Sequence, residues 1–114
     1  MELNKEAENK IAKLQMMEQN LQSINLQKQT FQSQLLEIEN ALNELVNVKE
    51  AYKIVGQIMI ASKKEYLEKE LDQKKEILDL RVKSLDKQEK DLKDKASSLQ
   101  SEILKSLNKS KDRS

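Results

Sequence analysis

Apolar residues recur at a seven-residue interval through the first 45 residues, and this repeat limits the possible folds more than any other feature of the chain. Two positions of each heptad, a and d, are apolar in eleven of thirteen cases. The a positions are Ala7, Leu14, Leu21, Lys28, Leu35 and Leu42, and the d positions are Leu3, Lys10, Met17, Ile24, Phe31, Ile38 and Leu45. Such a sustained repeat is typical of a left-handed coiled coil. We therefore predict a helix over residues 1–48 that packs against a second helix.

A second repeat follows in the C-terminal half. Leucines recur every seven residues at Leu71, Leu78, Leu85, Leu92 and Leu99, and the matching a positions are Lys75, Val82, Glu89, Ala96 and Ile103. The faces outside this seam are dense in Lys, Glu and Asp, which is typical of a solvated helix surface. The repeat predicts a helix over 64–108, followed by a disordered tail over 109–114.

Heptad order is lost over residues 51–62, where β-branched residues cluster around Gly56, the only glycine of the chain. Glycine at the first central position of a two-residue turn is the signature of a type II′ hairpin. We predict strands at about 52–55 and 58–61 with Gly56-Gln57 as the turn. The competing interpretation is one uninterrupted helix, because a glycine inside a helix costs only about 1 kcal/mol.

The two repeats can be tested for agreement, because residues that share a layer of a folded-back coiled coil have numbers with a constant sum. Four leucine pairs add to 113 and place the reversal between residues 56 and 57: Leu14–Leu99, Leu21–Leu92, Leu35–Leu78 and Leu42–Leu71. The same register puts Lys28 and Glu89 in adjacent layers, so we predict that they pair and lock the register. Alternatively, Lys28 extends its ammonium group into water.

An isolated two-stranded hairpin is marginally stable in water, and this one has no other strands to cover it. We expect the missing strands to come from other chains, in a closed β-barrel from which the helices project. The fold class is therefore mainly α: a long antiparallel two-helix coiled coil within a single unit, 1–114, joined by a hairpin that assembles with other subunits. The alternative is a short, poorly ordered connector at 51–62.

The layers weaken toward the chain termini, where Lys10 meets Ile103 and Ala7 meets Ser106. We expect this end of the coiled coil to fray and to expose apolar surface on Leu3, Ile11, Ile103, Leu104 and Leu107. Exposed apolar patches often mark interaction sites. Plain end fraying without a function remains the alternative.

Composition argues against several classes of function. The net charge is +1, so no overall field favours nucleic acid or an anionic membrane. The chain has no His and no Cys, so we expect no catalytic residues, no metal and no cofactor. No segment is apolar enough for secretion or membrane spanning, and the lack of Cys fits the cytoplasm.

Several segments are similar to those of one known family. The sharpest is Tyr52-Lys53-Ile54-Val55-Gly56 followed by Ile58-Met59-Ile60, set between two helices of similar length; the others are Leu26-Gln27-Lys28-Gln29, Leu85-Asp86-Lys87-Gln88-Glu89, and Leu99-Gln100 with Ile103. These segments resemble the β-type subunit of prefoldin. The similarity covers almost the whole chain. One departure is that Val48-Lys49-Glu50-Ala51 stands where many relatives carry a connector containing proline.

The resemblance implies a cytoplasmic chaperone subunit rather than an enzyme. It implies a hexamer of two α-type and four β-type subunits that captures non-native proteins without ATP and passes them to a group II chaperonin. On that analogy the client contacts are Leu3, Ala7, Ile11, Ile103, Leu104 and Leu107, and the assembly residues are Tyr52, Ile54, Val55, Gly56, Ile58, Met59 and Ile60.

Two other functions are compatible with heptad repeats. A leucine-zipper transcription factor needs a continuous basic helix before its leucines, whereas residues 64–76 carry charges of both signs. A generic coiled-coil scaffold or tether without chaperone activity needs only the heptads, and it stays open as the alternative.

Overall fold

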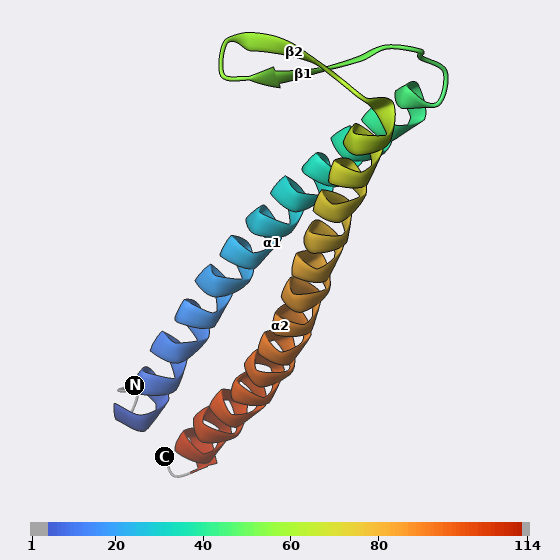
Figure 1. Cartoon of the computed structure of the whole chain (residues 1–114). Helices are drawn as coiled ribbons and strands as arrows, with labels where there is room; N and C mark the ends of the chain where they lie inside the picture. The colour runs from blue at the N-terminus through green and yellow to red at the C-terminus, as the bar shows by residue number, and fades with distance from the viewer. Residues whose placement is uncertain (1–4, 113–114) are drawn as a thin grey trace. The chain divides into compact units, whose positions relative to one another are not determined.

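The chain folds into two long helices with a two-stranded antiparallel hairpin between them (Figure 1). The computed structural model describes residues 5–112, with side chains for 5–108. The order is α1 (Lys5–Leu45), β1 (Ala51–Val55), β2 (Ile58–Ser62) and α2 (Lys64–Asp112). The structure divides into a terminal unit, Met1–Gln27 with Leu85–Ser114, and a hairpin unit, Lys28–Ser84.

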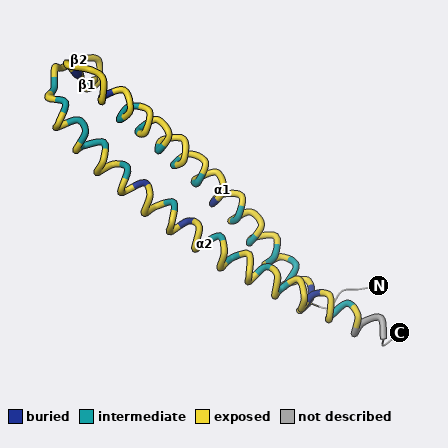
Figure 2. Tube along the Cα trace, turned by 90° about the vertical axis from the view of Figure 1, so that its right-hand side faces the viewer, coloured by how far each residue is buried: buried dark blue, intermediate teal, exposed yellow. Residues whose placement is uncertain are grey.

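The side chains that are buried or half-buried follow the predicted a and d positions on both helices. On α1 every a and d residue from Ala7 to Leu45 is at least half-buried, and the only other such positions are Ile11 and Ala41. On α2 the same holds for every a and d residue from Leu71 to Ile103. Figure 2 shows these positions recurring along one side of each helix. The predicted coiled-coil seams are confirmed.

In the terminal unit, the seam is closed by small and branched side chains. Ala7 is the most buried, at 2% exposed, and Ile24, Leu85 and Ile103 are also buried. An ion pair between Lys10 Nζ and Glu102 Oε2, 3.6 Å long, joins the two helices beside this seam. The helices of this unit therefore pack against each other close to the chain termini.

In the hairpin unit, the seam is completed by contacts of a different kind. Leu45 and Leu78 are buried. The guanidinium carbon of Arg81 lies 5.7 Å from the centre of the Phe31 ring, a cation–π arrangement that shields one face of this aromatic residue. Lys75 Nζ and Glu39 Oε1 are 3.8 Å apart across the helices.

The hairpin has the predicted turn and register. The paired residues run from Ala51 with Ser62 to Val55 with Ile58, and the residue numbers of each pair add to 113, as in the predicted helix layers. Gly56 has a φ of 62°, whereas no described residue other than glycine has a positive φ, so Gln57 does not. A positive φ at the first central residue alone defines a type II′ turn. The alternative of one uninterrupted helix is wrong.

Two element boundaries differ from those expected. Helix α1 ends at Leu45 and not at residue 48, because Leu45 is its last seam residue and the Val46 side chain is 67% exposed. Helix α2 continues to Asp112 and not only to residue 108, since no Gly or Pro interrupts it. The segment expected beyond this helix is correspondingly shorter, and residues 113–114 lie outside the described part of the chain.

Candidate assembly and binding surfaces

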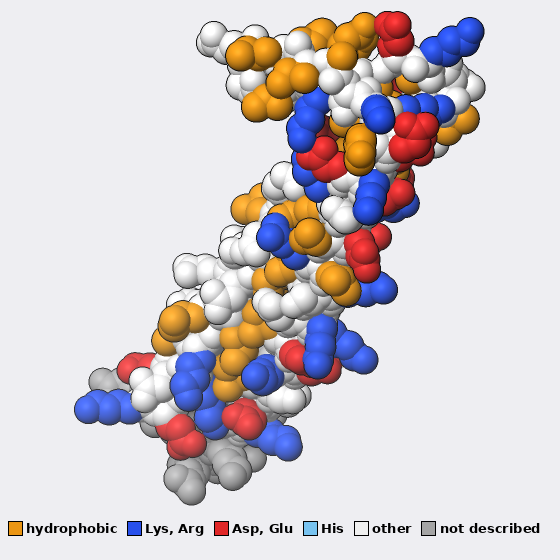
Figure 3. Space-filling model, viewed as in Figure 1, with side chains coloured by type: hydrophobic (Ala, Val, Ile, Leu, Met, Phe, Trp, Pro, Cys, Tyr) orange, Lys and Arg blue, Asp and Glu red, His pale blue; other side chains and the backbone are white. Residues whose placement is uncertain are grey.

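The hairpin carries an exposed apolar surface that its own chain does not cover. Its large apolar side chains are between 49% and 68% exposed, and we call them the hairpin surface: Tyr52, Ile54, Val55, Ile58, Met59 and Ile60. Figure 3 shows apolar side chains gathered over this part of the molecule. The fold thus brings every predicted assembly residue onto one hairpin: Gly56 is in its turn, and the others are on a two-stranded sheet with two open edges.

Strand geometry separates the hairpin surface into two faces, since neighbouring residues of a strand point to opposite sides. Ile54 pairs with Met59 and lies on the same face as Tyr52, whereas Lys53 pairs with Ile60 on the other face. Both faces are therefore largely apolar, and Lys53 is the one charged residue among them.

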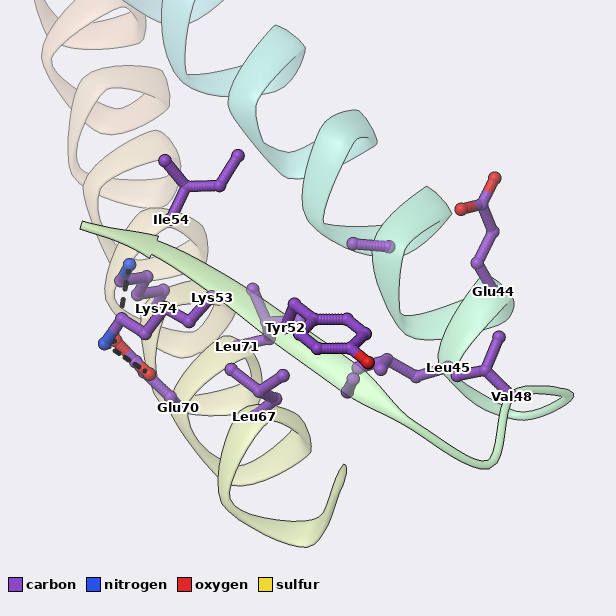
Figure 4. A pocket seen from close by; sticks show the side chains of 12 residues that line it. Glu44, Leu45, Val48, Tyr52, Lys53, Ile54, Leu67, Glu70, Leu71 and Lys74 are labelled. Atoms are coloured by element: carbon purple, nitrogen blue, oxygen red, sulfur yellow. Dashed lines mark hydrogen bonds and ion pairs between the residues drawn. The ribbon is translucent and has the colours of Figure 1, made fainter. Parts of the chain in front are cut away.

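Lys53 ties the hairpin to α2. Its Nζ donates hydrogen bonds to both carboxylate oxygens of Glu70, at 2.7 and 3.0 Å (Figure 4). Lys74 Nζ lies 3.7 Å from the same carboxylate, one helical turn further along. The hydrogen bond from Lys53 is the main cause that holds the pKa of Glu70 below its ordinary value. Neither Lys53 nor Glu70 was predicted as a site residue, because a contact across 17 residues leaves no local sequence signal.

An open groove of about 470 Å³ lies beside this ion pair, between the end of α1, strand β1 and the start of α2 (Figure 4). Its apolar lining is Ala41, Leu45, Val48, Ala51, Tyr52, Ile54, Leu67 and Leu71, and its charged lining is Glu44, Lys53, Glu70 and Lys74. Tyr52 and Ile54 belong both to this groove and to the hairpin surface. The groove is thus continuous with the surface predicted for assembly.

The connector between α1 and β1 is held by two further contacts. Lys64 Nζ donates to the carbonyl oxygen of Val46 at 3.1 Å, so the start of α2 supplies a cation to the end of α1. The last turn of α1 has no basic residue of its own. A cation near a helix C-terminus interacts favourably with the helix dipole. Tyr52 also donates its phenol hydrogen to Glu50 Oε2 at 2.9 Å.

The predicted client contacts near the chain ends differ in accessibility. Ala7 and Ile103 are buried, Ile11 and Leu107 are half-buried, and Leu104 is 61% exposed. Leu3 lies outside the described residues. The expected exposure of Ile103 is wrong, because the described part of this end is helical and closes around the small Ala7 side chain and the Lys10–Glu102 pair. The expected fraying stays a prediction. The role of these residues in client binding stays a prediction.

Two shallow grooves on the terminal unit were not foreseen from the sequence. One, of about 470 Å³, is lined by Asn20, Ser23, Ile24, Gln27, Gln88, Asp91, Leu92 and Lys95. The other, of about 390 Å³, is lined by Lys13, Met17, Asp94, Lys95, Ser98, Leu99 and Glu102. Both are lined by Lys95 and by seam residues of the two helices. They place apolar surface on the side of the helix pair as well as at its end.

The predicted pair of Lys28 and Glu89 has one residue in each unit, and it stays a prediction. Both side chains are half-buried, as their seam positions require. Glu89 Oε1 lies 3.4 Å from Lys93 Nζ on its own helix.

Within residues 5–112, no helix is both long enough and apolar enough to cross a bilayer. The same residues contain no group of three or more His, Cys, Asp or Glu side chains placed to hold a metal ion.

Comparison with known proteins places this architecture in one family. The sequence profile of the family described as "Prefoldin subunit" matches residues 8–110. A relative named prefoldin subunit beta from Archaeoglobus fulgidus is 36% identical over 105 residues, covering 90% of both chains. Another, from Saccharolobus islandicus, is 37% identical over 107 residues, covering 91% of this chain and 85% of the relative.

A solved structure agrees with the sequence matches. The crystal structure of the prefoldin beta subunit from Thermococcus strain KS-1 superposes with a TM-score of 0.87 at 30% identity, covering 93% of this chain and 96% of that one. The agreement extends over both helices and the hairpin between them, so the predicted resemblance is confirmed and the chain belongs to the prefoldin subunit family.

Proposed function

We propose that this chain is one subunit of an ATP-independent holdase chaperone of the cytoplasm. In this proposal the hairpin joins it to α-type prefoldin subunits and to other copies of itself, in a hexamer of two α-type and four β-type subunits. The terminal unit binds non-native proteins, and the assembly delivers them to a group II chaperonin. The exposed hairpin surface is the single observation that carries the proposal.

Assembly through the hairpin follows from its lack of cover. The two strands carry six large apolar side chains, of which five are more than half exposed and the sixth, Ile60, is 49% exposed. A hairpin of this kind gains stability when partner strands pair with its edges and bury its faces. A β-barrel of several hairpins removes both edges at once. Membership of the prefoldin subunit family supports partners of the same kind.

Client binding is proposed for the terminal unit, at the helix ends that are next to the two chain termini. Leu104 is largely exposed there, and Ile11 and Leu107 are half-buried, so these three offer apolar surface while the two helices are packed together. Ala7 and Ile103 would contribute only when a client separates the helix ends. Weakly specific apolar contacts suit a chaperone, because its clients share exposed apolar side chains rather than a sequence.

The first experiment measures assembly and holdase activity together. The full chain is purified alone and with an α-type prefoldin partner, and native mass and suppression of client aggregation are recorded without ATP. We expect a hexamer and suppression in the mixture. A stable homodimer that suppresses nothing, with or without the partner, would contradict the proposal and favour a generic coiled-coil tether.

The second experiment tests where clients bind. Leu104→Ser is compared with Leu80→Ser, because both leucines are on α2 and both are 61% exposed. We expect Leu104→Ser to weaken the suppression of aggregation by the hexamer and Leu80→Ser to leave it unchanged. Equal effects of the two changes would show that exposed apolar surface in general, and not the terminal unit, captures the client.

A further inference from the structure

The hairpin is attached to the rest of the hairpin unit by few contacts, and one of them is a charge-assisted pair of hydrogen bonds. The two hydrogen bonds from Lys53 to Glu70 are 2.7 and 3.0 Å long. Two ion pairs that join α1 to α2 are looser, since Lys10–Glu102 measures 3.6 Å and Lys75–Glu39 measures 3.8 Å. A lysine held by both oxygens of one carboxylate has its ammonium fixed in position, and charge-assisted hydrogen bonds are stronger than neutral ones.

Little else fixes the orientation of the strands. Ala51, the first residue of β1, is the only buried residue of the two strands, both of which the structure describes in full. It holds the base of the hairpin but lies at its end. Lys53 is in the middle of β1, so its bond to α2 resists rotation of the strand about its own axis. An anchor at the base and a tether at the centre together define one orientation.

That orientation decides which apolar face is offered to a partner. Because strand residues alternate, a Lys53 side chain bonded to α2 places Tyr52 and Ile54 on the other face of the strand with Met59, and Tyr52 and Ile54 also form one wall of the groove described above. The large apolar residues of that face, Tyr52, Ile54 and Met59, are 54%, 68% and 65% exposed. Those on the face of Lys53, which are Val55, Ile58 and Ile60, are 52%, 65% and 49% exposed. The face that bears Ile54 and Met59 is therefore the more open one.

We propose that the Lys53–Glu70 ion pair, supported by Lys74, is a positioning contact that orients the hairpin for assembly, so that the face bearing Tyr52, Ile54 and Met59 meets the neighbouring subunit. The inference rests on the proposed role of the hairpin in assembly. Its physical basis is preorganisation, since a partner that meets an oriented hairpin does not have to order it on binding. Lys53 and Glu70 act through the hairpin and need no contact with the partner themselves.

The test reverses the two charges singly and together in the full-length chain. Lys53→Glu, Glu70→Lys and the double reversal are each mixed with the α-type partner, and the concentration at half-assembly is measured by native mass. Lys49→Glu and Glu76→Lys are the matched controls. Both residues are exposed, and these substitutions make the same two charge changes at positions outside the Lys53–Glu70 pair. Circular dichroism of each free chain verifies that the helices form.

We expect each single reversal to raise the half-assembly concentration about fivefold, in line with the strength of a good exposed ion pair, and the controls to leave it unchanged. The double reversal should restore assembly, because the carboxylate introduced at position 53 would then face the ammonium introduced at position 70, with the ammonium of Lys74 beside it. A merely structural role of Lys53 in the strand would not produce this rescue.

Two results would overturn the inference while leaving the proposed assembly intact. In one, Lys53→Glu assembles as well as Lys49→Glu. In the other, the single reversals weaken assembly but the double reversal does not restore it, which would indicate that Lys53 contacts the partner directly. Failure of the unmodified chain to assemble at all would instead overturn the proposed function.

Discussion

Two leucines on α2, only two residues apart, differ greatly in exposure, so we predict that replacing them has very different effects on stability. Leu78 occupies a d position and is 8% exposed, whereas Leu80 lies on the outer face and is 61% exposed. In the register that sums to 113, Leu78 shares a layer with Leu35, which is half-buried. Leu78→Ala therefore removes buried carbon from the seam, and Leu80→Ala removes carbon that water already contacts.

The magnitude follows from the side chain that is lost. Leu→Ala removes three carbons at about 0.8 kcal/mol each when buried, which gives a loss of about 2 kcal/mol for Leu78. This is at the lower end for leucine truncations, because a layer of two helices is open to solvent on both sides and can close around the gap. Leu80→Ala should change stability by less than about 0.5 kcal/mol.

Thermal unfolding of the free chain, followed by circular dichroism at low concentration, measures the difference. A loss of about 2 kcal/mol should lower the midpoint by about 8 °C in a chain of this length, and Leu80→Ala should leave it nearly unchanged. The heptad assignment would be refuted if the two variants shifted the midpoint equally. A repeat with the chain assembled with other prefoldin subunits should give the same order, because neither residue belongs to the hairpin surface.

Three further predictions concern the hairpin unit. The pKa of Glu70 is lowered mainly by the hydrogen bond from Lys53, so the ionised carboxylate stabilises the folded chain at pH values above its ordinary pKa, and this stabilisation is lost as the pH falls through the lowered pKa. Glu70→Gln should remove that part of the pH dependence of the unfolding midpoint. An unchanged pH dependence in this variant would contradict the account. Gly56→Ala should destabilise the hairpin by about 1 kcal/mol through its φ of 62° alone, since a Cβ there meets no atom within 4 Å; unchanged assembly and midpoint would count against a type II′ turn. Lys64→Met should loosen the last turn of α1 by removing the hydrogen bond to Val46, seen as faster amide exchange there, whereas Lys63→Met should not.

Much of the fold was predictable because its signals are local or periodic. The heptads predicted the seam residues of both helices, and the single glycine predicted the reversal. The same constant, 113, describes the predicted helix layers and the strand pairs that form. These features need only the repeat of the helix, the alternation of the strand and the conformational freedom of glycine.

The candidate surfaces were less predictable, and the errors have physical causes. Ala7 and Ile103 were expected at a frayed end, yet they are buried, because a small residue allows the two helices to approach and the Lys10–Glu102 pair closes the layer. Helix α1 ends before residue 48, because Leu45 is the last residue of its seam and helix propensity alone does not extend the helix further. In each case the sequence showed the residue type but not the side chain opposite it.

The heptad repeat that limits the fold most strongly therefore determined, from sequence alone, the two helices and the residues of their seams, and the single glycine determined the turn between the strands. Only the tertiary structure decided how the hairpin is held, because the bond from Lys53 to Glu70 joins a strand to a helix across 17 residues. Periodicity tells which side of each element is apolar. The orientation of one element on another depends on single contacts between distant residues, and those exist only once the chain has folded.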